Sequence, residues 1–170
     1  MTRHPGDTWH LIELADLKPG ARVLDLGAGD GDGVRLLRSL GFEAYGVDRK
    51  AAPDVDEGNL LHTGFADASF DAVMSECAFF VSGDEPGALR ECARLLKQGG
   101  TLLLADVFFE PPEPLLEAAG FRINAKEDWT GAWREYYLRS IWEGTAAKRT
   151  TLRERSSFSR VLERSISGAI

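Results

Sequence analysis

The chain has 170 residues, 44% of them hydrophobic, and a formal net charge of -7 at pH 7, which suits one domain with a single core. No stretch approaches the roughly 18 consecutive apolar residues of a membrane span, and residues 1–9 lack the apolar core of a signal peptide. These features predict a cytoplasmic protein without a membrane partner, and the acidic balance argues against nucleic acid, because phosphate contacts need clustered lysine and arginine.

The sequence predicts strands that alternate with helices, with glycine or proline at most boundaries. In chain order, the expected elements are a helix over 9–15 capped by Asp7, a strand over 21–26, a helix over 34–40, a strand over 43–48, a brief strand near 55–60, a strand over 70–75, a helix from Ser82 or Asp84 to the glycines at 99–100, a strand over 101–107, a helix over 114–119 and a strand over 121–126. This alternation favours right-handed crossovers and a mainly parallel sheet.

The C-terminal part of the chain has a different pattern. From Trp133 onward the apolar residues are spaced as in helices, including Phe158, Val161 and Leu162. Residues 139–170 carry seven basic and three acidic side chains, so we expect a single domain over 1–170 that ends in a basic helical tail over 139–170. The tail is interpreted first as a solvated face that complements the acidic body, and second as a site for an anionic substrate or partner.

A glycine-rich loop joins the strand over 21–26 to the helix that follows. Gly27, Gly29 and Gly31 lack side chains, so the backbone can turn sharply and approach a ligand, while the next helix offers free N–H groups. In open α/β sheets, ligands bind where the strand order reverses, and the first loop of this kind lies there. The loop therefore predicts a site for a nucleotide-like cofactor.

The charge of this loop discriminates among such cofactors. Dinucleotide sites have the spacing Gly-x-Gly-x-x-Gly, but counted from Gly27 the sixth position is Asp32. Asp25, Asp30 and Asp32 would repel a diphosphate, and no lysine lies within the loop to offset them. S-adenosylmethionine carries a sulfonium and an ammonium group against one carboxylate, so it suits the loop better.

Two later positions extend the expected site. Asp48 ends the second strand, 23 residues after Asp25, where a carboxylate can accept hydrogen bonds from both ribose hydroxyls. Asn59 and Leu60 follow the brief third strand, where an amide and a backbone N–H can read an adenine edge. The alternative interpretation of Asp48 is a carboxylate at a strand end with no ligand.

Four motifs then occur in order between residues 20 and 107. They are VLDLGAGDGDG from Val23, AYGVD ending at Asp48, ASFDAVMSE from Ala68 to Glu76, and RLLKQGGTLLLAD from Arg94 to Asp106. Together they resemble the motifs of class I S-adenosylmethionine-dependent methyltransferases, and in particular the type 11 methyltransferase domain typified by ubiquinone and menaquinone biosynthesis enzymes. The resemblance implies a Rossmann-like α/β fold with a sheet ordered 3-2-1-4-5-7-6, whose seventh strand is either missing or lies within 133–138.

The resemblance also implies which residues hold the cofactor, with Asp25 and residues 27–29 near the methionine part and Asp48 on the ribose. The full expected set is Asp25, Gly27, Ala28, Gly29, Asp48, Arg49, Asn59, Leu60 and Ser75. Two positions depart from the family pattern, which usually has aspartate in place of Asn59 and Leu-Pro-Phe in place of residues 63–65.

The expected reaction is methyl transfer to a small-molecule acceptor. Methyl transfer is an in-line displacement, so positioning and exclusion of water supply much of the acceleration and a base is optional. If the acceptor must lose a proton, Glu76, His10 and His62 are the candidates; a solvated or structurally paired side chain is the alternative for each. Residues 78–81 and 108–109 are candidates for an apolar acceptor pocket.

The remaining expectations concern thiols, metals and partners. Cys77 and Cys92 are expected to be reduced, with a packed thiol favoured over substrate contact at Cys77. The histidines and cysteines lack metal-ligand spacing, so no metal is expected. The C-terminal helices are expected to supply a homodimer surface that includes 133–142. Two other functions stay open: a catalytically inactive S-adenosylmethionine-binding module and, less favoured, an NAD-dependent oxidoreductase.

Overall fold

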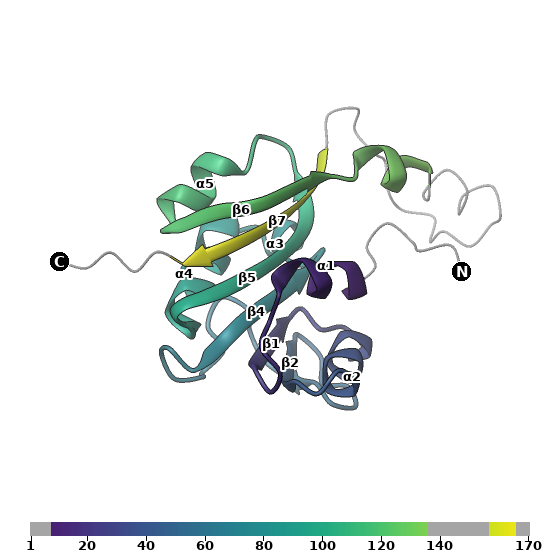
Figure 1. Ribbon diagram of the computed structural model, residues 1–170, viewed down its shortest axis with the longest axis vertical. Coiled ribbons are helices and arrows are strands. Elements are labelled where there is room, and N and C mark those ends of the chain that lie inside the picture. The colour runs from purple at the N-terminus through teal and green to yellow at the C-terminus, as the bar shows by residue number, and fades with distance from the viewer. Residues whose placement is uncertain (1–7, 136–156, 166–170) are drawn as a thin grey trace.

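The computed structural model describes residues 8–135 and 157–165 (Figure 1). The strands are β1 (Arg22–Leu26), β2 (Glu43–Asp48), β3 (Asp56–Glu57), β4 (Phe70–Glu76), β5 (Leu96–Phe108), β6 (Phe121–Asp128) and β7 (Ser157–Ser165). The helices are α1 (Thr8–Ala15), α2 (Asp32–Ser39), α3 (Phe79–Ser82), α4 (Glu85–Leu95) and α5 (Glu113–Ala118). Residues 130–135 are also helical.

The strands form one seven-stranded sheet in the order β3-β2-β1-β4-β5-β7-β6. The first five strands in this order, β3-β2-β1-β4-β5, pair in parallel. Strand β7 lies between β5 and β6 and is antiparallel to both. The order reverses between β1 and β4, because the chain moves outward from β1 to β3 and then returns to the other side of β1. The Rossmann-like fold and the strand order implied by the resemblance are confirmed.

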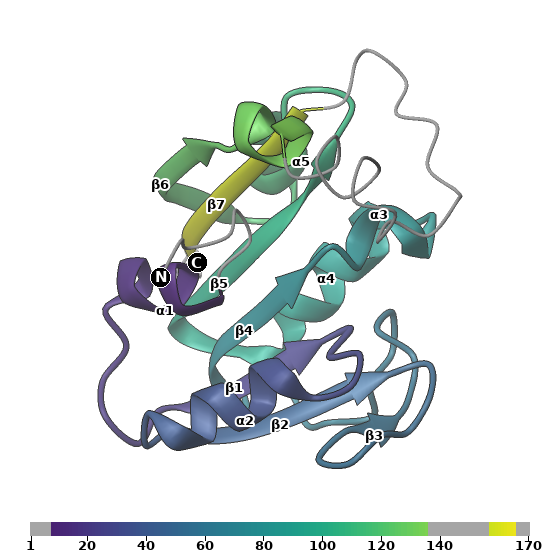
Figure 2. The same ribbon diagram turned by 90° about the vertical axis from the view of Figure 1, so that its right-hand side faces the viewer.

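Helices cover both faces of the sheet (Figure 2). On one face, α1 and α2 pack Leu11, Val34 and Leu37 against alternate residues of the central strands. On the other face, α4 and α5 pack their apolar residues, including Leu89 and Leu116, against the intervening positions. Because strand side chains alternate between faces, the same alternation assigns Asp25, Glu76 and Glu127 to the face that carries α1.

Two expectations for the C-terminal part were wrong. Residues 157–165 form strand β7 rather than a helix, because their backbone pairs with β5 on one side and β6 on the other, and such pairing overrides local helical spacing. The seventh strand does not begin at Trp133, since residues 130–135 are helical. The expected helical positions from Tyr137 to Trp142, and most of the proposed dimer surface, lie outside the described residues.

Smaller differences concern element boundaries. The helix expected to reach the glycines at 99–100 ends at Leu95, and β5 begins at once with Leu96, whose pairing with Phe70 precedes an irregular register. Of the two expected caps for α4, Asp84 is the one used, and its side chain accepts a hydrogen bond from the Gly87 N–H at 2.9 Å. None of the helices in the described ranges is long and apolar enough to cross a membrane.

Candidate active site

A cavity lies at the carboxyl ends of the central strands, where the strand order reverses. It has a volume of about 110 Å³ and is lined by Gly27, Asp48, Arg49, Leu60, Cys77, Ala78 and Val81. An outer groove of about 480 Å³ shares Arg49, Leu60 and Val81 with it and is further lined by Glu57, Gly58, Asn59, Leu61 and Ser82. The shared residues make the two hollows neighbours, so together they can hold an elongated ligand.

The glycine loop forms the floor of the inner cavity. Gly27 has a φ of +80°, and a Cβ added there would lie 2.3 Å from the Cβ of Ala78, so only glycine fits. The N–H groups of Gly27 and Ala28 donate to the Val47 carbonyl at 2.8 and 3.1 Å. Next to them, the Gly29 N–H donates to the Asp48 carboxylate at 3.0 Å. The loop is therefore fixed to the end of β2.

Asp25 lies beneath this floor with only 5% of its surface exposed. Burial raises the pKa of its carboxyl group, and the negative charges of Glu76 and Asp48 raise it further, to about 7. The packing around it is tight, because a Cβ added at Gly33 would lie 2.4 Å from the Asp25 carboxylate. The site thus concentrates negative charge at the ends of three adjacent strands, an arrangement that favours a cationic ligand.

The wall opposite the glycine loop comes from the segment after β4. Cys77 adopts the left-handed conformation with φ +54° and donates its N–H to the Ala105 carbonyl at 2.7 Å. The buried Asp106 carboxylate accepts hydrogen bonds from the Phe79 and Phe80 N–H groups at 2.7 and 3.4 Å. Burial raises the pKa of Asp106 to about 6, despite these bonds, which act in the opposite direction. Asp106 therefore fixes the start of α3, and with it the cavity wall.

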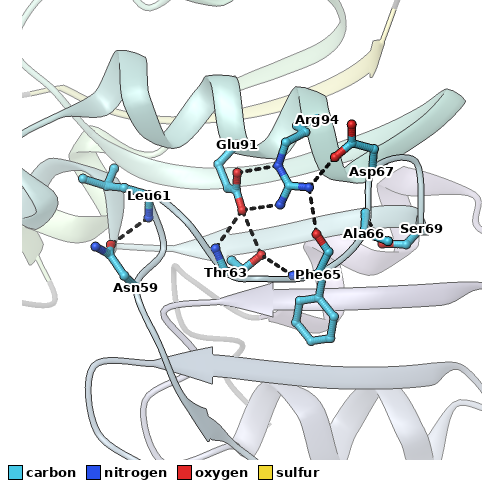
Figure 3. Close-up of polar contacts among 9 residues, drawn as sticks. All are labelled: Asn59, Leu61, Thr63, Phe65, Ala66, Asp67, Ser69, Glu91 and Arg94. Atoms are coloured by element: carbon cyan, nitrogen blue, oxygen red, sulfur yellow. Dashed lines mark hydrogen bonds and ion pairs between the residues drawn. The ribbon is translucent and has the colours of Figure 1, made fainter.

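The segment from Asn59 to Ser69 runs along α4 (Figure 3), and its first three residues line the groove. Glu91, only 5% exposed, accepts hydrogen bonds from the N–H and hydroxyl groups of Thr63, both at 2.8 Å. Arg94 donates two bonds to Glu91, at 2.7 and 2.8 Å, and a third to the Phe65 carbonyl at 2.7 Å. Burial alone would raise the pKa of Glu91, but the bonds from Arg94 and Thr63 outweigh it and lower the pKa to about 2.

The structure brings together most of the residues expected at the cofactor site. Gly27, Asp48, Arg49 and Leu60 line the inner cavity, and Asn59 lines the outer groove. Three others support the lining: Asp25 and Ala28 are buried below it, and Gly29 bonds to Asp48. Ser75 lines neither hollow; it is fully buried and donates to the Leu26 carbonyl at 2.8 Å, which ties β4 to β1.

The three base candidates occupy different places. Glu76 ends β4 on the same sheet face as Asp25 and contributes to the raised pKa of that carboxyl group. His62 is exposed in a turn that its N–H closes on the Asn59 carbonyl at 2.9 Å, and it lines neither hollow. His10 on α1 hydrogen-bonds through Nε2 to Glu127 at 3.0 Å.

The partner of His10 connects it to the carboxyl edge of the sheet. Glu127 lies level with Ala105 and Glu76, because β6, β7, β5 and β4 pair in register there. Trp129 donates its indole N–H to the same Glu127 oxygen at 2.7 Å, and its ring lies 5.7 Å from the His10 ring. His10 is thus held in one orientation on the face that carries Asp25.

The sequence identified the glycine loop more clearly than the opposite wall. From the sequence, residues 78–81 are candidates for the acceptor pocket and Cys77 is expected to be a packed thiol, whereas Gly58, Leu61 and Ser82 are not predicted at the site. The left-handed Cys77 had no sequence signal, since a positive φ at cysteine is uncommon. Neither cysteine forms a disulfide bond; Cys77 is half-buried and Cys92 is buried. Within residues 8–135, no cluster of three or more histidine, cysteine, aspartate or glutamate side chains is placed to hold a metal ion.

The comparisons with known proteins point to one family. A protein-family model described as a methyltransferase domain matches residues 24–104. The chain is 28% identical over 142 residues to demethylmenaquinone methyltransferase of Paenarthrobacter aurescens (strain TC1), covering 77% of this chain and 51% of that protein. The chain spans about half the length, or less, of the first curated relatives it matches.

Solved structures share the fold at lower identity. Phosphoethanolamine N-methyltransferase 2 of Haemonchus contortus, in complex with phosphomonomethylethanolamine and S-adenosylhomocysteine, has a TM-score of 0.74 at 17% identity, covering 94% of this chain and 52% of that chain. The [4+2]-cyclase SpnF has a TM-score of 0.77 at 19% identity, covering 95% of this chain and 80% of that chain. The second match is to a protein named for a different reaction, so the fold alone does not establish the chemistry.

Proposed function

We propose that this chain, whose residues 24–104 match a methyltransferase domain, transfers a methyl group from S-adenosylmethionine to a small-molecule acceptor. The observation that carries the proposal is the buried, charge-loaded Asp25 beneath the glycine floor, with Asp48 and Glu76 close enough to raise its pKa. A buried carboxyl group of this kind is costly to ionise unless a cation compensates for it.

The residues of the site fit the cofactor. Gly27 lines the inner cavity without a side chain, Asp48 can accept hydrogen bonds from ribose hydroxyls, and Asn59 and Leu60 line the groove on the side expected for the base. S-adenosylmethionine, when bound, supplies an electrophilic methyl group on a sulfonium centre. Asp25, Asp48 and Glu76 stabilise positive charge there, while Ala78 and Val81 present apolar surface that excludes water.

For acceptors that must lose a proton, we propose His10 as the base. Glu127 and Trp129 fix the orientation of its ring, as is typical of a histidine that accepts a proton. The methyl group then forms its new bond to the acceptor as the bond to sulfur breaks, and the acceptor's proton passes to the imidazole. His62 is a weaker candidate because it is exposed, whereas His10 is half-buried and held by Glu127 and Trp129.

A binding experiment tests the cofactor assignment. Calorimetric titration of the purified protein with each compound separately should show binding of S-adenosylhomocysteine and no binding of NAD. Binding of NAD without S-adenosylhomocysteine would favour the oxidoreductase alternative and contradict the proposal. Binding of the cofactor without turnover across a broad panel of acceptors would instead favour an inactive binding module.

The role of His10 has its own test. His10→Asn should lower kcat on any accepted substrate with an ionisable nucleophile and leave the dissociation constant of S-adenosylhomocysteine unchanged, because His10 does not line the cofactor hollows. An unchanged kcat would remove His10 from the mechanism. A cytoplasmic location and a homodimer that uses residues 133–142 are also part of the proposal, and light scattering of the purified chain tests the dimer.

A further inference from the structure

We propose that Glu91, paired with Arg94, is a positioning residue for the base of the cofactor. This inference rests on the proposed function and assigns a role to two residues of α4 that line neither hollow. Their effect passes through the segment 59–65, which carries Asn59 and Leu60 into the groove.

The first step is the local order of the groove residues. The Asn59 side-chain oxygen accepts a hydrogen bond from the Leu61 N–H at 2.9 Å, and the His62 N–H donates to the Asn59 carbonyl at 2.9 Å. Because an N–H must meet an oxygen, the first bond fixes which end of the amide is which. The Asn59 oxygen thus faces the turn, and its NH₂ group is oriented as a donor on the other side of the amide.

The second step is how this turn is held in place. Immediately after it, the main-chain N–H of Thr63 and the carbonyl of Phe65 are both bound by the Glu91–Arg94 pair (Figure 3). The fork of Arg94 meets Glu91 in a bidentate arrangement that fixes both side chains. The two partners therefore define where the backbone leaves the turn.

The third step is the nature of the other anchors: Leu60 and Leu61 pack against the apolar core, and the Gly58 N–H donates to the Asp48 carbonyl at 2.8 Å. The strand before the turn, β3, has only two residues, so the sheet itself supplies little restraint. The ring of Phe65 packs edge-on against Phe70 at 5.1 Å and holds the far end of the segment. Apolar packing of this kind has little direction, whereas the Glu91–Arg94 pair adds directional hydrogen bonds from α4 to Thr63 and to the Phe65 carbonyl.

The test compares recognition of two bases rather than affinity alone. S-adenosylhomocysteine and S-inosylhomocysteine differ at positions 1 and 6 of the purine, where hydrogen-bonding groups are exchanged. We expect the native protein to prefer the adenine compound by about tenfold or more, as a site with fixed hydrogen-bonding groups does. Glu91→Gln keeps the side-chain volume but places an amide against Arg94, and should reduce this preference to about threefold or less.

A matched control separates positioning from general destabilisation. Asp71 is also held by a backbone N–H and a cationic side chain, at the start of the central strand β4, where it accepts bonds from the Arg22 N–H and Lys97, both at 2.8 Å. Asp71→Asn should leave the preference for adenine unchanged. Partial unfolding weakens both ligands equally, so it does not alter their ratio.

The outcomes distinguish this inference from the function it rests on. If the native protein binds neither compound, the proposed function fails. If it binds both equally, or if Glu91→Gln retains the full preference while Asp71→Asn behaves as native, the positioning role is wrong. A reduced ratio in Glu91→Gln alone supports it.

Discussion

Replacing Asp25 by asparagine should stabilise the free protein while weakening cofactor binding. The reason is the raised pKa of the buried carboxyl group, about 7 against the ordinary 3.8. The folded protein therefore holds this proton more tightly than the unfolded chain. Its contribution to stability is complete below about pH 4 and declines as the pH rises towards 7.

The magnitude follows from the size of that shift. Each pKa unit corresponds to about 1.4 kcal/mol, so a shift of about 3 units makes the ionised Asp25 cost the folded state about 4 kcal/mol at pH 8. Asparagine has nearly the same shape as aspartate and is uncharged throughout this pH range. Asp25→Asn should therefore resemble the native protein near pH 4 and be more stable at pH 8, by up to about 4 kcal/mol.

Urea denaturation at pH 5 and pH 8, monitored by the fluorescence of the four tryptophans, measures this difference in the free energy of unfolding. Calorimetry at pH 8 should show weaker binding of S-adenosylhomocysteine to the variant. Asp30→Asn, on the exposed part of the same loop, serves as the control and should change neither quantity. If the gain in stability is the same at both pH values, the assignment of a costly buried charge to Asp25 is refuted.

Three further substitutions test the cavity. Gly27→Ala should cost about 1–2 kcal/mol of stability from its left-handed backbone and abolish S-adenosylhomocysteine binding through the clash with Ala78, whereas Gly20→Ala, with φ +76° and open space around it, should retain binding. Asp48→Ala should raise the dissociation constant of S-adenosylhomocysteine about tenfold or more, since charge-assisted bonds contribute about 1.5–3 kcal/mol; an unchanged constant would remove Asp48 from the ribose site. Asp106→Asn should weaken binding by loosening the start of α3, and equal binding with a lower melting temperature would restrict Asp106 to a structural role.

The parts of the fold that the sequence predicted well are those in which local signals and tertiary contacts agree. The apolar strand before Gly27 and the acidic end of β2 at Asp48 have strong local patterns, and the parallel sheet places them together. Ser75 shows the limit of this reasoning, because it was among the residues expected to bind the cofactor, while the structure uses its hydroxyl group between β1 and β4. The sequence alone does not show which side chains at the end of a strand face a cavity.

The Glu91–Arg94 pair beside the outer groove could not be predicted for a similar reason. Glu91 and Arg94 read as the ordinary polar residues of an amphipathic helix, and Thr63 lies 28 positions before Glu91 in the chain. Only the packing of α4 against the segment 59–69 brings these groups together. Contacts between residues so far apart depend on the whole fold and leave no periodic signal.

The position of β7 has a consequence for how the molecule is made. β7 lies between β5 and β6, although it follows both in the chain. Until residues 157–165 have been synthesised, the backbone groups of β5 and β6 that pair with β7 have no partner, and bare strand edges invite association with other chains. The glycine loop and the central strands are therefore synthesised before the strand that completes the sheet. Pairing of β7 with β5 and β6 is a late step that joins residues far apart in the chain.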